Sequence, residues 1–369
     1  MLPNPWPISA GRLRLALIFL ALHATPTHAN PLAELGRALF FDPNLSEPPG
    51  QACATCHDPA QAFSDPRGAL GGALSLGADG HSLGERNTPG LTYVAFVPQF
   101  SKAGEHYQGG LFLDGRAATL AEQALEPMLN PLEMALPSKA AVIERVLGNP
   151  AHRSALTAQF SAGVLEREDA LIQAITTAIA AFERSKEFST FDSRYDRSLT
   201  GDYEMTREEA IGREVFFSGL VNCIQCHLNE PNKVSERETF TNHRYHNIGV
   251  PQNPAIAGEP DPGLAGHLED PSEAGKFRVP TLRNVAVTAP YMHNGVFQNL
   301  ETAVAFYAKY TLRHQRNPET GAFWRAPAVP ENIDQEILAD GQPIDPERIH
   351  HLTAFLKTLT DRRYEHLLD

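Results

Sequence analysis

Two copies of the motif Cys-x-x-Cys-His constrain this 369-residue chain more than any other feature of its sequence. Each copy offers two thiols followed directly by an imidazole, namely Cys53, Cys56 and His57 in the first copy and Cys223, Cys226 and His227 in the second. This spacing is the attachment signature for c-type haem, because two thiols can add to the vinyl groups on one porphyrin edge while the adjacent histidine reaches the iron. We therefore expect two covalently bound haems, each with its motif histidine as proximal iron ligand.

Other uses of the cysteines stay open at this point. A single C-x-x-C pair can form a redox disulfide or half of a zinc site, and four cysteines can together bind one zinc ion. The two motifs use all 4 cysteines of the chain, and each is followed by a histidine. Their wide separation, in repeated contexts and behind an export leader, favours haem.

The N-terminus predicts export. Residues 1–29 combine a basic start at Arg12 and Arg14, a short apolar core over 15–22 and a small-x-small cleavage site that ends at Ala29. The apolar core is too short to span a bilayer, which favours a cleaved secretory signal over an uncleaved anchor. No later segment is apolar enough to cross a membrane, so we expect a mature periplasmic protein without membrane insertion.

The charge balance narrows the choice of partners. The chain has 31 Lys and Arg against 44 Asp and Glu, a formal net charge of −13. The leader contains Arg12 and Arg14 but no acidic residue, so its loss makes the net charge more negative. This excess of acid argues against binding of nucleic acid or of an anionic membrane surface. It fits a small oxidant as substrate, or a partner protein with a basic patch.

The two haem motifs lie in an internal repeat. The segment 35–41, Leu-Gly-Arg-Ala-Leu-Phe-Phe, precedes the first motif, and the segment 211–217, Ile-Gly-Arg-Glu-Val-Phe-Phe, precedes the second. An amphipathic helix is predicted to close each half, over 168–187 and 346–368. A duplication explains this pattern.

The halves correspond to two predicted domains, an N-terminal haem domain over 30–197 and a C-terminal haem domain over 198–369. Strand signals are sparse, and the stretches 58–110, 228–290 and 313–345 are rich in Gly, Pro, Asn and Asp, which predicts long loops. Loops of this length usually serve a function, and wrapping a large prosthetic group is one. The expected fold is mainly α, with two cytochrome c-like helical haem domains and long loops.

The chain resembles the bacterial di-haem cytochrome c peroxidase and MauG family over nearly all of its mature length. The resemblance includes both haem motifs and several short segments, which are 114–117 (Asp-Gly-Arg-Ala), 122–124 (Glu-Gln-Ala), 130–134 (Asn-Pro-Leu-Glu-Met), 280–284 (Pro-Thr-Leu-Arg-Asn) and 289–293 (Ala-Pro-Tyr-Met-His). It implies two cytochrome c-like domains packed across a calcium site. It also implies a reaction that begins with hydrogen peroxide at the N-terminal haem.

Within this resemblance, Gln123 and Glu133 match the distal pocket pair of the family, with Pro127 between them. Cleavage of peroxide needs a group that moves a proton from one oxygen to the other, which a carboxylate beside an open iron can do, and an amide can orient the peroxide. Both residues are therefore candidate catalytic residues. Without the family pattern, Glu133 would be interpreted as a surface charge and Gln123 as a structural amide.

The resemblance also implies a calcium ion between the domains. Asn87 matches the family's side-chain ligand, and Thr288 and Pro290 match the backbone carbonyls that complete the site. Oxygen donors suit calcium, which is a hard cation. With a single side-chain donor, an ordinary turn asparagine is the alternative.

Two departures from the peroxidase branch concern the iron ligands. Ala78 stands where that branch has a histidine that caps the first haem at rest; His81 could substitute, but a solvated loop histidine is favoured, so the first haem should be open to peroxide. Tyr307 stands where that branch has a methionine ligand of the second haem. A phenolate favours ferric iron and higher oxidation states, so we expect Tyr307 to bind the second iron, the alternative being an ordinary core aromatic. This pattern resembles the MauG/MbnH-like branch, whose members oxidise tryptophans of a partner protein.

The chain also departs from the MauG branch in its tryptophans. Leu113 replaces the tryptophan that lies between the haems, and Val221 replaces a second one on the route to the protein substrate. Trp324 is the one tryptophan of the mature chain. Electrons would then pass between the haems directly, or through an aromatic such as Phe112 or Tyr93.

Three functions follow as hypotheses. The first is a periplasmic di-haem oxidoreductase that reacts with hydrogen peroxide at the N-terminal haem and uses the oxidising equivalents on a secreted protein partner. The second is a cytochrome c peroxidase that draws electrons from a small cytochrome or cupredoxin. The third is a non-catalytic di-haem electron carrier. Tyr307 and Ala78 favour the first, and the pair Gln123 and Glu133 argues against the third.

Overall fold

The computed structural model describes Met1 and residues 30–67, 73–228, 237–311 and 316–368. Apart from Met1, the export leader lies outside the described residues, so the leader and its cleavage stay a prediction. Within the described residues, no helix combines the length and the apolar character that crossing a membrane requires. Helices make up most of the regular structure, which confirms the predicted mainly α fold.

The first half of the chain is helical around the first haem motif. Its α-helices are α1 (Pro31–Phe40), α2 (Cys53–Cys56), α3 (Leu120–Gln123), α4 (Glu126–Leu129), α5 (Lys139–Gly148), α6 (Pro150–Phe160) and α7 (Glu168–Glu183), and its 3-10 helices are η1 (Pro59–Gln61), η3 (Val94–Phe96) and η4 (Ala162–Glu166). Asn30 caps α1 by accepting the backbone N–H of Leu32. The strands β1 (Ser101–Ala103) and β2 (His106–Gln108) form a short antiparallel hairpin in the first long loop.

The second half repeats this organisation. Its α-helices are α8 (Arg194–Thr200), α9 (Arg207–Phe217), α10 (Cys223–His227), α11 (Leu264–Leu268), α12 (Leu300–Thr311), α13 (Gln335–Ala339) and α14 (Pro346–Lys357), and its 3-10 helices are η5 (Pro271–Glu273), η6 (Val285–Val287) and η7 (Arg362–Leu367). Thr206 and Glu209 form a capping box at the start of α9. The strands β3 (Tyr245–His246) and β4 (Phe277–Arg278) pair antiparallel.

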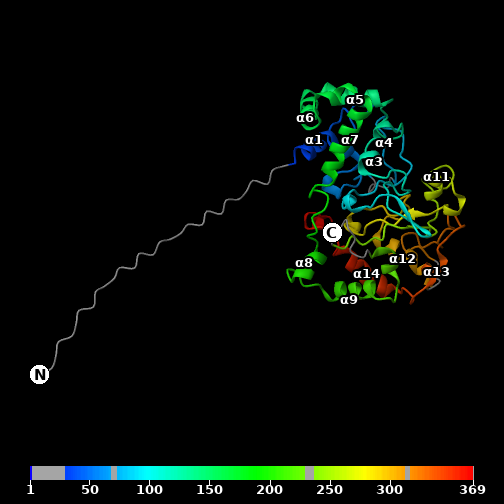
Figure 1. The fold of residues 1–369 in the computed structure, drawn as a ribbon. Coiled ribbons are helices and arrows are strands. Elements are labelled where there is room, and N and C mark those ends of the chain that lie inside the picture. Colours follow the sequence, from blue (N-terminus) through cyan, green and yellow to red (C-terminus); the bar gives the residue numbers. More distant parts are fainter. Residues whose placement is uncertain (2–29, 68–72, 229–236, 312–315, 369) are drawn as a thin grey trace.

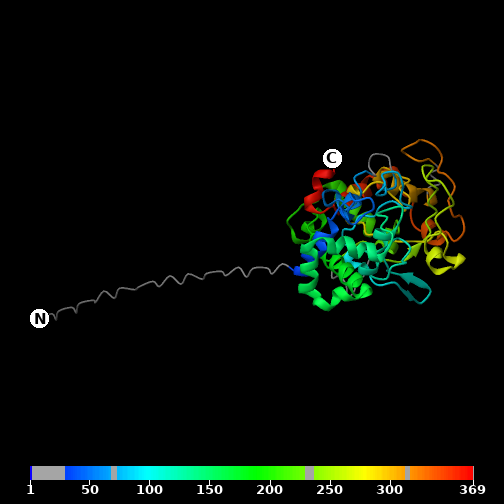
Figure 2. The same cartoon turned by 90° about the horizontal axis from the view of Figure 1, so that it is seen from above.

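Each half has its own aromatic core. Figure 1 shows α1 and α5–α7 in one lobe and α8, α9 and α14 in the other, and Figure 2 shows the long loop segments gathered on one side of the molecule. The two cores are built from buried rings, which are Phe40, Phe63, Phe182 and Phe188 in the first and Tyr195, Phe216, Phe240 and Phe355 in the second. Cys53 packs against the first core and Cys223 against the second, so each haem motif adjoins one core.

The predicted elements and the observed ones differ at their ends. The helix predicted over 168–187 ends at Glu183. The helix predicted over 346–368 ends at Lys357, because the chain then turns to bring Asp361 into the interior, where Tyr93 and Asn284 donate hydrogen bonds to it. The predicted domain boundary at 197/198 falls inside α8, and the domain limits stay a prediction.

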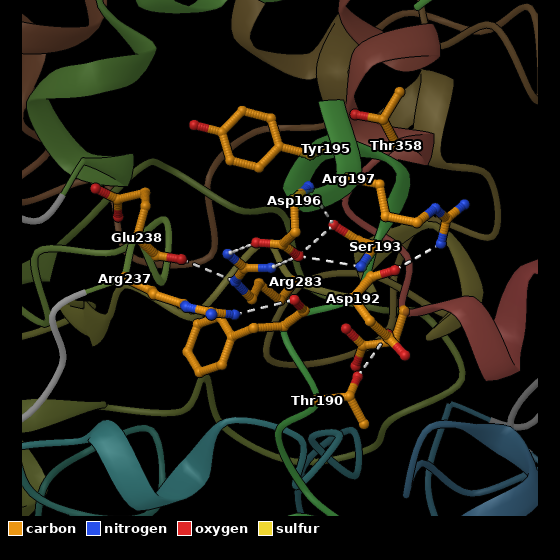
Figure 3. Close-up of polar contacts among 12 residues, drawn as sticks. Thr190, Asp192, Ser193, Tyr195, Asp196, Arg197, Arg237, Glu238, Arg283 and Thr358 are labelled. Atoms are coloured by element: carbon orange, nitrogen blue, oxygen red, sulfur yellow. Dashed lines mark hydrogen bonds and ion pairs between the residues drawn. The ribbon is translucent and has the colours of Figure 1, made fainter. Parts of the chain in front are cut away.

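A buried arginine joins the segment between the halves to the second core. Arg283 is 2% exposed and forms two hydrogen bonds with the carboxylate of Asp196, with N···O distances of 2.7 and 3.0 Å. Its Nε donates to the carbonyl oxygen of Glu238 at 2.8 Å, and its guanidinium lies over the rings of Tyr93 and Phe191. Figure 3 shows the ion pair at the centre of a wider polar cluster. Because Tyr93 belongs to the first half, this cluster links the two halves.

Two further side chains cross between the halves. The hydroxyl of Tyr93 donates to Asp361 at 2.5 Å. Arg86 pairs with Asp114 of its own half at 2.7 Å and with Asp261 of the second half at 2.6 Å. These contacts are partly or fully buried, and those of Tyr93 and of Arg86 with Asp261 hold the two halves together.

Candidate functional site

The first haem motif lies on α2, against the first core. This four-residue helix carries both cysteines, and His57 follows it as the C-cap residue. The imidazole Nδ1 of His57 lies 3.0 Å from the carbonyl oxygen of Phe63, so Nδ1 carries the proton and Nε2 is left to bind a metal. Burial lowers the pKa of His57, which keeps the ring in the neutral form that binds iron.

The second motif, on α10, has the same local geometry. Nδ1 of His227 lies 3.2 Å from the carbonyl oxygen of Phe240, and burial lowers the pKa of His227 to about 4. Phe63 and Phe240 are both fully buried, and both have a positive φ, +56° and +55°. In both halves, the carbonyl group that orients the motif histidine therefore comes from a buried phenylalanine outside the Cys-x-x-Cys-His motif.

The thiols fit thioether attachment. The four cysteines form no disulfide, and the two pairs lie against different cores, which rules out a single four-cysteine zinc site. Sγ of Cys56 accepts hydrogen bonds from Gln51 at 3.2 Å and from Arg67 at 3.1 Å. Burial raises the pKa of Cys53 to about 12. Neutral, oriented thiols beside a histidine with a free Nε2 are the donor set that a c-type haem needs.

A largely apolar cavity of about 350 Å³ adjoins the second motif. The motif lines it with Cys223, Cys226 and His227, and α12 lines it with Tyr307. Burial, and then the nearby thiols, raise the pKa of the Tyr307 phenol. The cavity thus brings together the two residues that were predicted to bind the second iron, an imidazole and a phenol, and the donors fit that metal.

The internal repeat indicates why the two haem sites differ. A short bridged turn precedes α3 and a similar one precedes α12, closed by the bridges Leu111–Ala117 and Tyr291–Phe297. Carried along the chain at the same spacing, this repeat aligns Tyr307 with Pro127. A proline side chain has no donor for iron, whereas a tyrosine has a phenol oxygen. The two halves share a scaffold but differ at the position that could close each site.

Glu133 lines a hollow on the first half. Pro127, Asn130 and Phe112 line the same hollow. Nδ2 of Asn130 donates to Oε1 of Glu133 at 2.9 Å, and burial raises the pKa of Glu133 above its ordinary value. A carboxyl group that is held in place and has its pKa moved toward neutral pH can both accept and release a proton.

Hydrogen bonds connect Glu133 to the first haem motif. The backbone N–H of Ala78 donates to the carbonyl oxygen of Glu133 at 2.7 Å. Nε2 of Gln51 donates to the carbonyl oxygen of Leu76 and to Sγ of Cys56, both at 3.2 Å. The turn that contains Leu76 and Ala78 therefore joins the thiol of Cys56 to the backbone of Glu133, so Glu133 belongs to the surroundings of the first motif.

Gln123, the predicted distal amide, and His81, the candidate cap of the first haem, do not line this hollow. Gln123 is the last residue of α3 and is partly buried, but it is not among the described residues that line the hollow. Its part in orienting peroxide stays a prediction. His81 is exposed, and its backbone N–H donates to Oδ1 of Asp79 at 2.9 Å.

The three predicted calcium ligands lie together between the halves. Nδ2 of Asn87 donates to the carbonyl oxygen of Pro290 at 2.6 Å, and its backbone N–H donates to the carbonyl oxygen of His293 at 2.9 Å. Thr288 lines the same cavity as Asn87 and Pro290. One amide and two backbone carbonyls form a donor set that suits calcium, and calcium binding stays a prediction.

The residues that replace tryptophans lie close to the second site. Leu113 and Val221 both line the cavity beside the second motif. Trp324 packs edge-to-face on the aromatic rings of the second half. Neither Phe112 nor Tyr93 is among the described residues that line that cavity, so the electron route between the haems stays a prediction.

Comparisons with known proteins bear on the class of protein. A family model described as di-haem cytochrome c peroxidase matches residues 30–204. The methylamine utilization protein MauG of Paracoccus denitrificans (strain Pd 1222) is 49% identical over 370 residues, which cover 95% of this chain and 95% of that protein. The cytochrome c551 peroxidase of Nitrosomonas europaea is 31% identical over 80% of this chain and 78% of that protein.

Solved structures agree with these relatives. The diheme peroxidase BthA from Burkholderia thailandensis E264 aligns with a TM-score of 0.78 and 34% identity, over 91% of this chain and 87% of that chain. A MauG-like protein associated with microbial copper homeostasis aligns with a TM-score of 0.69 and 28% identity, over 91% of this chain and 93% of that chain. Fold and paired haem motifs together define an oxidoreductase with two haem groups. The chain belongs to the di-haem cytochrome c peroxidase and MauG family.

Two arginines near the sites, Arg67 and Arg283, were not among the residues predicted from the sequence to have a function. Arg67 donates to Sγ of Cys56, and no local motif marks it. Arg283 belongs to the segment 280–284 on which the resemblance rests, but its partner Asp196 lies far away in the chain. The long separation hides such pairs, although an arginine inside an otherwise apolar segment is a signal that an acid must lie nearby.

Proposed function

We propose that this chain is a periplasmic di-haem oxidoreductase that reacts with hydrogen peroxide at the first haem and uses the oxidising equivalents on a secreted protein partner. The equivalence of Pro127 and Tyr307 in the internal repeat supports this asymmetry most strongly. Pro127 has no donor and leaves its side of the first haem open, with Glu133 on the same hollow. Tyr307 has a donor and closes the second haem.

Glu133 moves the proton in the first step. When bound, the haem irons supply peroxide binding and hold the oxidising equivalents. The carboxylate of Glu133 accepts the proton of the inner peroxide oxygen and delivers it to the outer oxygen, which leaves as water. Asn130 holds Oε1 of Glu133 at 2.9 Å, and Gln123 orients the peroxide. The raised pKa of Glu133 brings both transfers within reach near neutral pH.

His227 and Tyr307 would hold the second haem, which would supply an electron relay and no substrate site. His227, whose ring is held by the carbonyl oxygen of Phe240, would bind the second iron through Nε2. Tyr307, which lines the same cavity, would supply a phenolate ligand to that iron, and a phenolate would stabilise its higher oxidation states. The position equivalent to the methionine of a scavenging peroxidase is thus a tyrosine, and this favours a protein partner over a small cytochrome or cupredoxin as the final electron source.

Export and calcium complete the proposal. The leader over 1–29 directs the chain to the periplasm. Asn87, Thr288 and Pro290 hold a structural calcium ion between the halves. A chelator added to the di-haem protein should then perturb the haem spectra, and added calcium should restore them. Spectra that do not respond to either addition would remove calcium from the account.

The test uses the purified di-haem protein. Mass spectrometry first counts the haems, and two additions are expected on the mature chain. One equivalent of hydrogen peroxide is then added with either reduced small cytochrome c or a tryptophan-bearing protein secreted by the same cell. The proposal expects an oxidised tryptophan in the second protein and slow oxidation of the cytochrome. Fast cytochrome turnover would instead favour a scavenging peroxidase, and no reaction with peroxide would favour an electron carrier.

A further inference from the structure

Arg278 places a positive charge on the wall of a cavity, where its side chain is half-buried. It is the second residue of β4, and it lines the cavity beside the second haem motif. Among the described residues, its guanidinium has no ion pair, and its buried Nε has no hydrogen-bond partner. Burial lowers the pKa of Arg278, which is the direction expected for a cation without a nearby anion.

The titratable groups next to Arg278 are neutral. Tyr245 lies opposite Arg278 in the β3–β4 pair, and its hydroxyl donates to the carbonyl oxygen of Gly109 at 2.6 Å. Burial, and then the charge of Arg278, lower the pKa of His243 to about 3, so its ring is uncharged near neutral pH. Neither neighbour supplies a negative charge to the half-buried guanidinium of Arg278.

Three acids between the halves are already paired with other arginines. The contacts are all 3.0 Å or shorter, and they join Arg283 to Asp196 and Arg86 to both Asp114 and Asp261. Figure 3 shows the first of these pairs, in which the carboxylate faces the guanidinium with both oxygens. Arg278 is the contrasting case, because its own face is turned to the cavity and no described carboxylate meets it.

A half-buried cation that faces a cavity without a counter-charge is stabilised by an anion, so the cavity favours an anion beside Arg278. On the proposed function, the cavity receives a haem whose thioether edge is fixed at Cys223 and Cys226. The opposite porphyrin edge carries two propionate carboxylates. A guanidinium binds a carboxylate through two parallel hydrogen bonds, a geometry that a lysine cannot reproduce.

We propose that Arg278 binds a propionate carboxylate of the second haem. The arginine then acts as a positioning residue that fixes the haem within the cavity. It also offsets the negative charge of the propionate, and so makes reduction of that haem easier. The first haem lies against the other core and should not respond to this residue.

The experiment measures the reduction potential of each haem in the Arg278→Gln holoprotein. Redox titration followed by electron paramagnetic resonance separates a five-coordinate haem from a six-coordinate one. For the second haem, we expect the equilibrium constant for reduction to fall about tenfold, which is a shift of about 59 mV to more negative potential for one electron. The matched control is Arg244→Gln, which removes the same charge from an exposed position two residues before His246.

Each outcome decides the proposal. A negative shift at the second haem alone, absent in Arg244→Gln, supports it. A shift at the first haem alone, or the same potentials in both variants, overturns it. If Arg278→Gln does not accumulate with two haems, Arg278→Lys replaces it, with a smaller shift of the same sign expected and an unchanged potential contradicting the proposal. A wild-type chain that lacks two haems would instead contradict the proposed function, and mass spectrometry detects that case separately.

Discussion

Gly212 lies so close to His351 that a Cβ atom added to the glycine would sit 1.8 Å from the backbone carbonyl oxygen of the histidine. The pair marks the crossing of α9 and α14. The first half has the same contact, because a Cβ on Gly36 would sit 1.8 Å from the carbonyl oxygen of Ala178 where α1 crosses α7. At each crossing the added Cβ would also approach the Cβ of a phenylalanine, Phe355 next to Gly212 and Phe182 next to Gly36.

This contact predicts the effect of a single methyl group. Gly212→Ala should force α9 and α14 apart and lower stability by about 1–3 kcal/mol or more, the usual cost of overpacking. For a domain of this size that corresponds to a fall in Tm of about 2–4 °C for each kcal/mol. Thermal unfolding of the di-haem protein, followed at a haem band, measures the shift.

Gly148 provides the matched control. It ends α5, and a Cβ there would meet no atom within 4 Å. Gly148→Ala should leave Tm unchanged or raise it slightly, because alanine favours helix over glycine. A Gly212→Ala protein as stable as Gly148→Ala would show that the helices can separate without cost.

Much of the fold was open to prediction from the repeated segments. The glycine in Leu-Gly-Arg and in Ile-Gly-Arg is the residue that lets two helices cross, so the repeat carried the packing as well as the motif. In the second half the repeated segment lies in α9, which begins at the capping box formed by Thr206 and Glu209. Helix ends were less predictable, because α14 ends where Asp361 turns inward to Tyr93, a partner in the other half.

The candidate site was predicted unevenly for a similar reason. Adjacent residues in the motif fix the role of His57 and His227, and a local turn holds Glu133 near the first motif. By contrast, Arg278 and Asp196 acquire their significance from residues that are distant in the chain. Periodicity and spacing describe neighbours along the sequence, and they contain no information on which charges meet across the domain junction.

The ion pair of Arg283 and Asp196 predicts a pH-dependent loss of stability. Burial alone would raise the pKa of Asp196, but the hydrogen bonds and charge of Arg283 outweigh it and lower the pKa. The pair therefore stabilises the fold above the ordinary aspartate pKa of about 3.9. That contribution is lost as the pH falls through the lowered pKa of Asp196 in the folded protein.

Asp196→Asn tests this dependence. At neutral pH the variant should be less stable by about 3–5 kcal/mol, because the buried guanidinium loses its partner charge. The deficit should narrow as the pH falls from about 4 through the lowered pKa of Asp196, where the wild-type carboxylate takes up a proton. Asp202→Asn, at an exposed position in the same segment, should show neither effect. A deficit of the same size at acid and neutral pH would show that lost packing, and not lost charge, destabilises the variant.

Tyr307→Met tests the closed second site. A thioether in place of the phenol should raise the reduction potential of the second haem on the order of 100 mV or more, within the roughly 0.8 V that axial ligands span, and should give a methionine-ligated spectrum. Tyr310→Phe, one turn away on α12, removes a hydroxyl that donates to the carbonyl oxygen of Ile248 and should leave that spectrum unchanged. Identical spectra for Tyr307→Met and wild type would mean that Tyr307 is not a ligand.

The central claim is that the first haem is the peroxide site and that Glu133 moves the proton there. Rapid mixing of the di-haem protein with hydrogen peroxide measures this step directly, before any partner is involved. Glu133→Gln should slow the second-order reaction about a hundredfold or more, the range of lost acid–base catalysis. Glu126→Gln, which removes a carboxylate from the wall of the same hollow, should react like wild type. Peroxide kinetics that are unchanged in Glu133→Gln, or equally slow in both variants, would contradict the account.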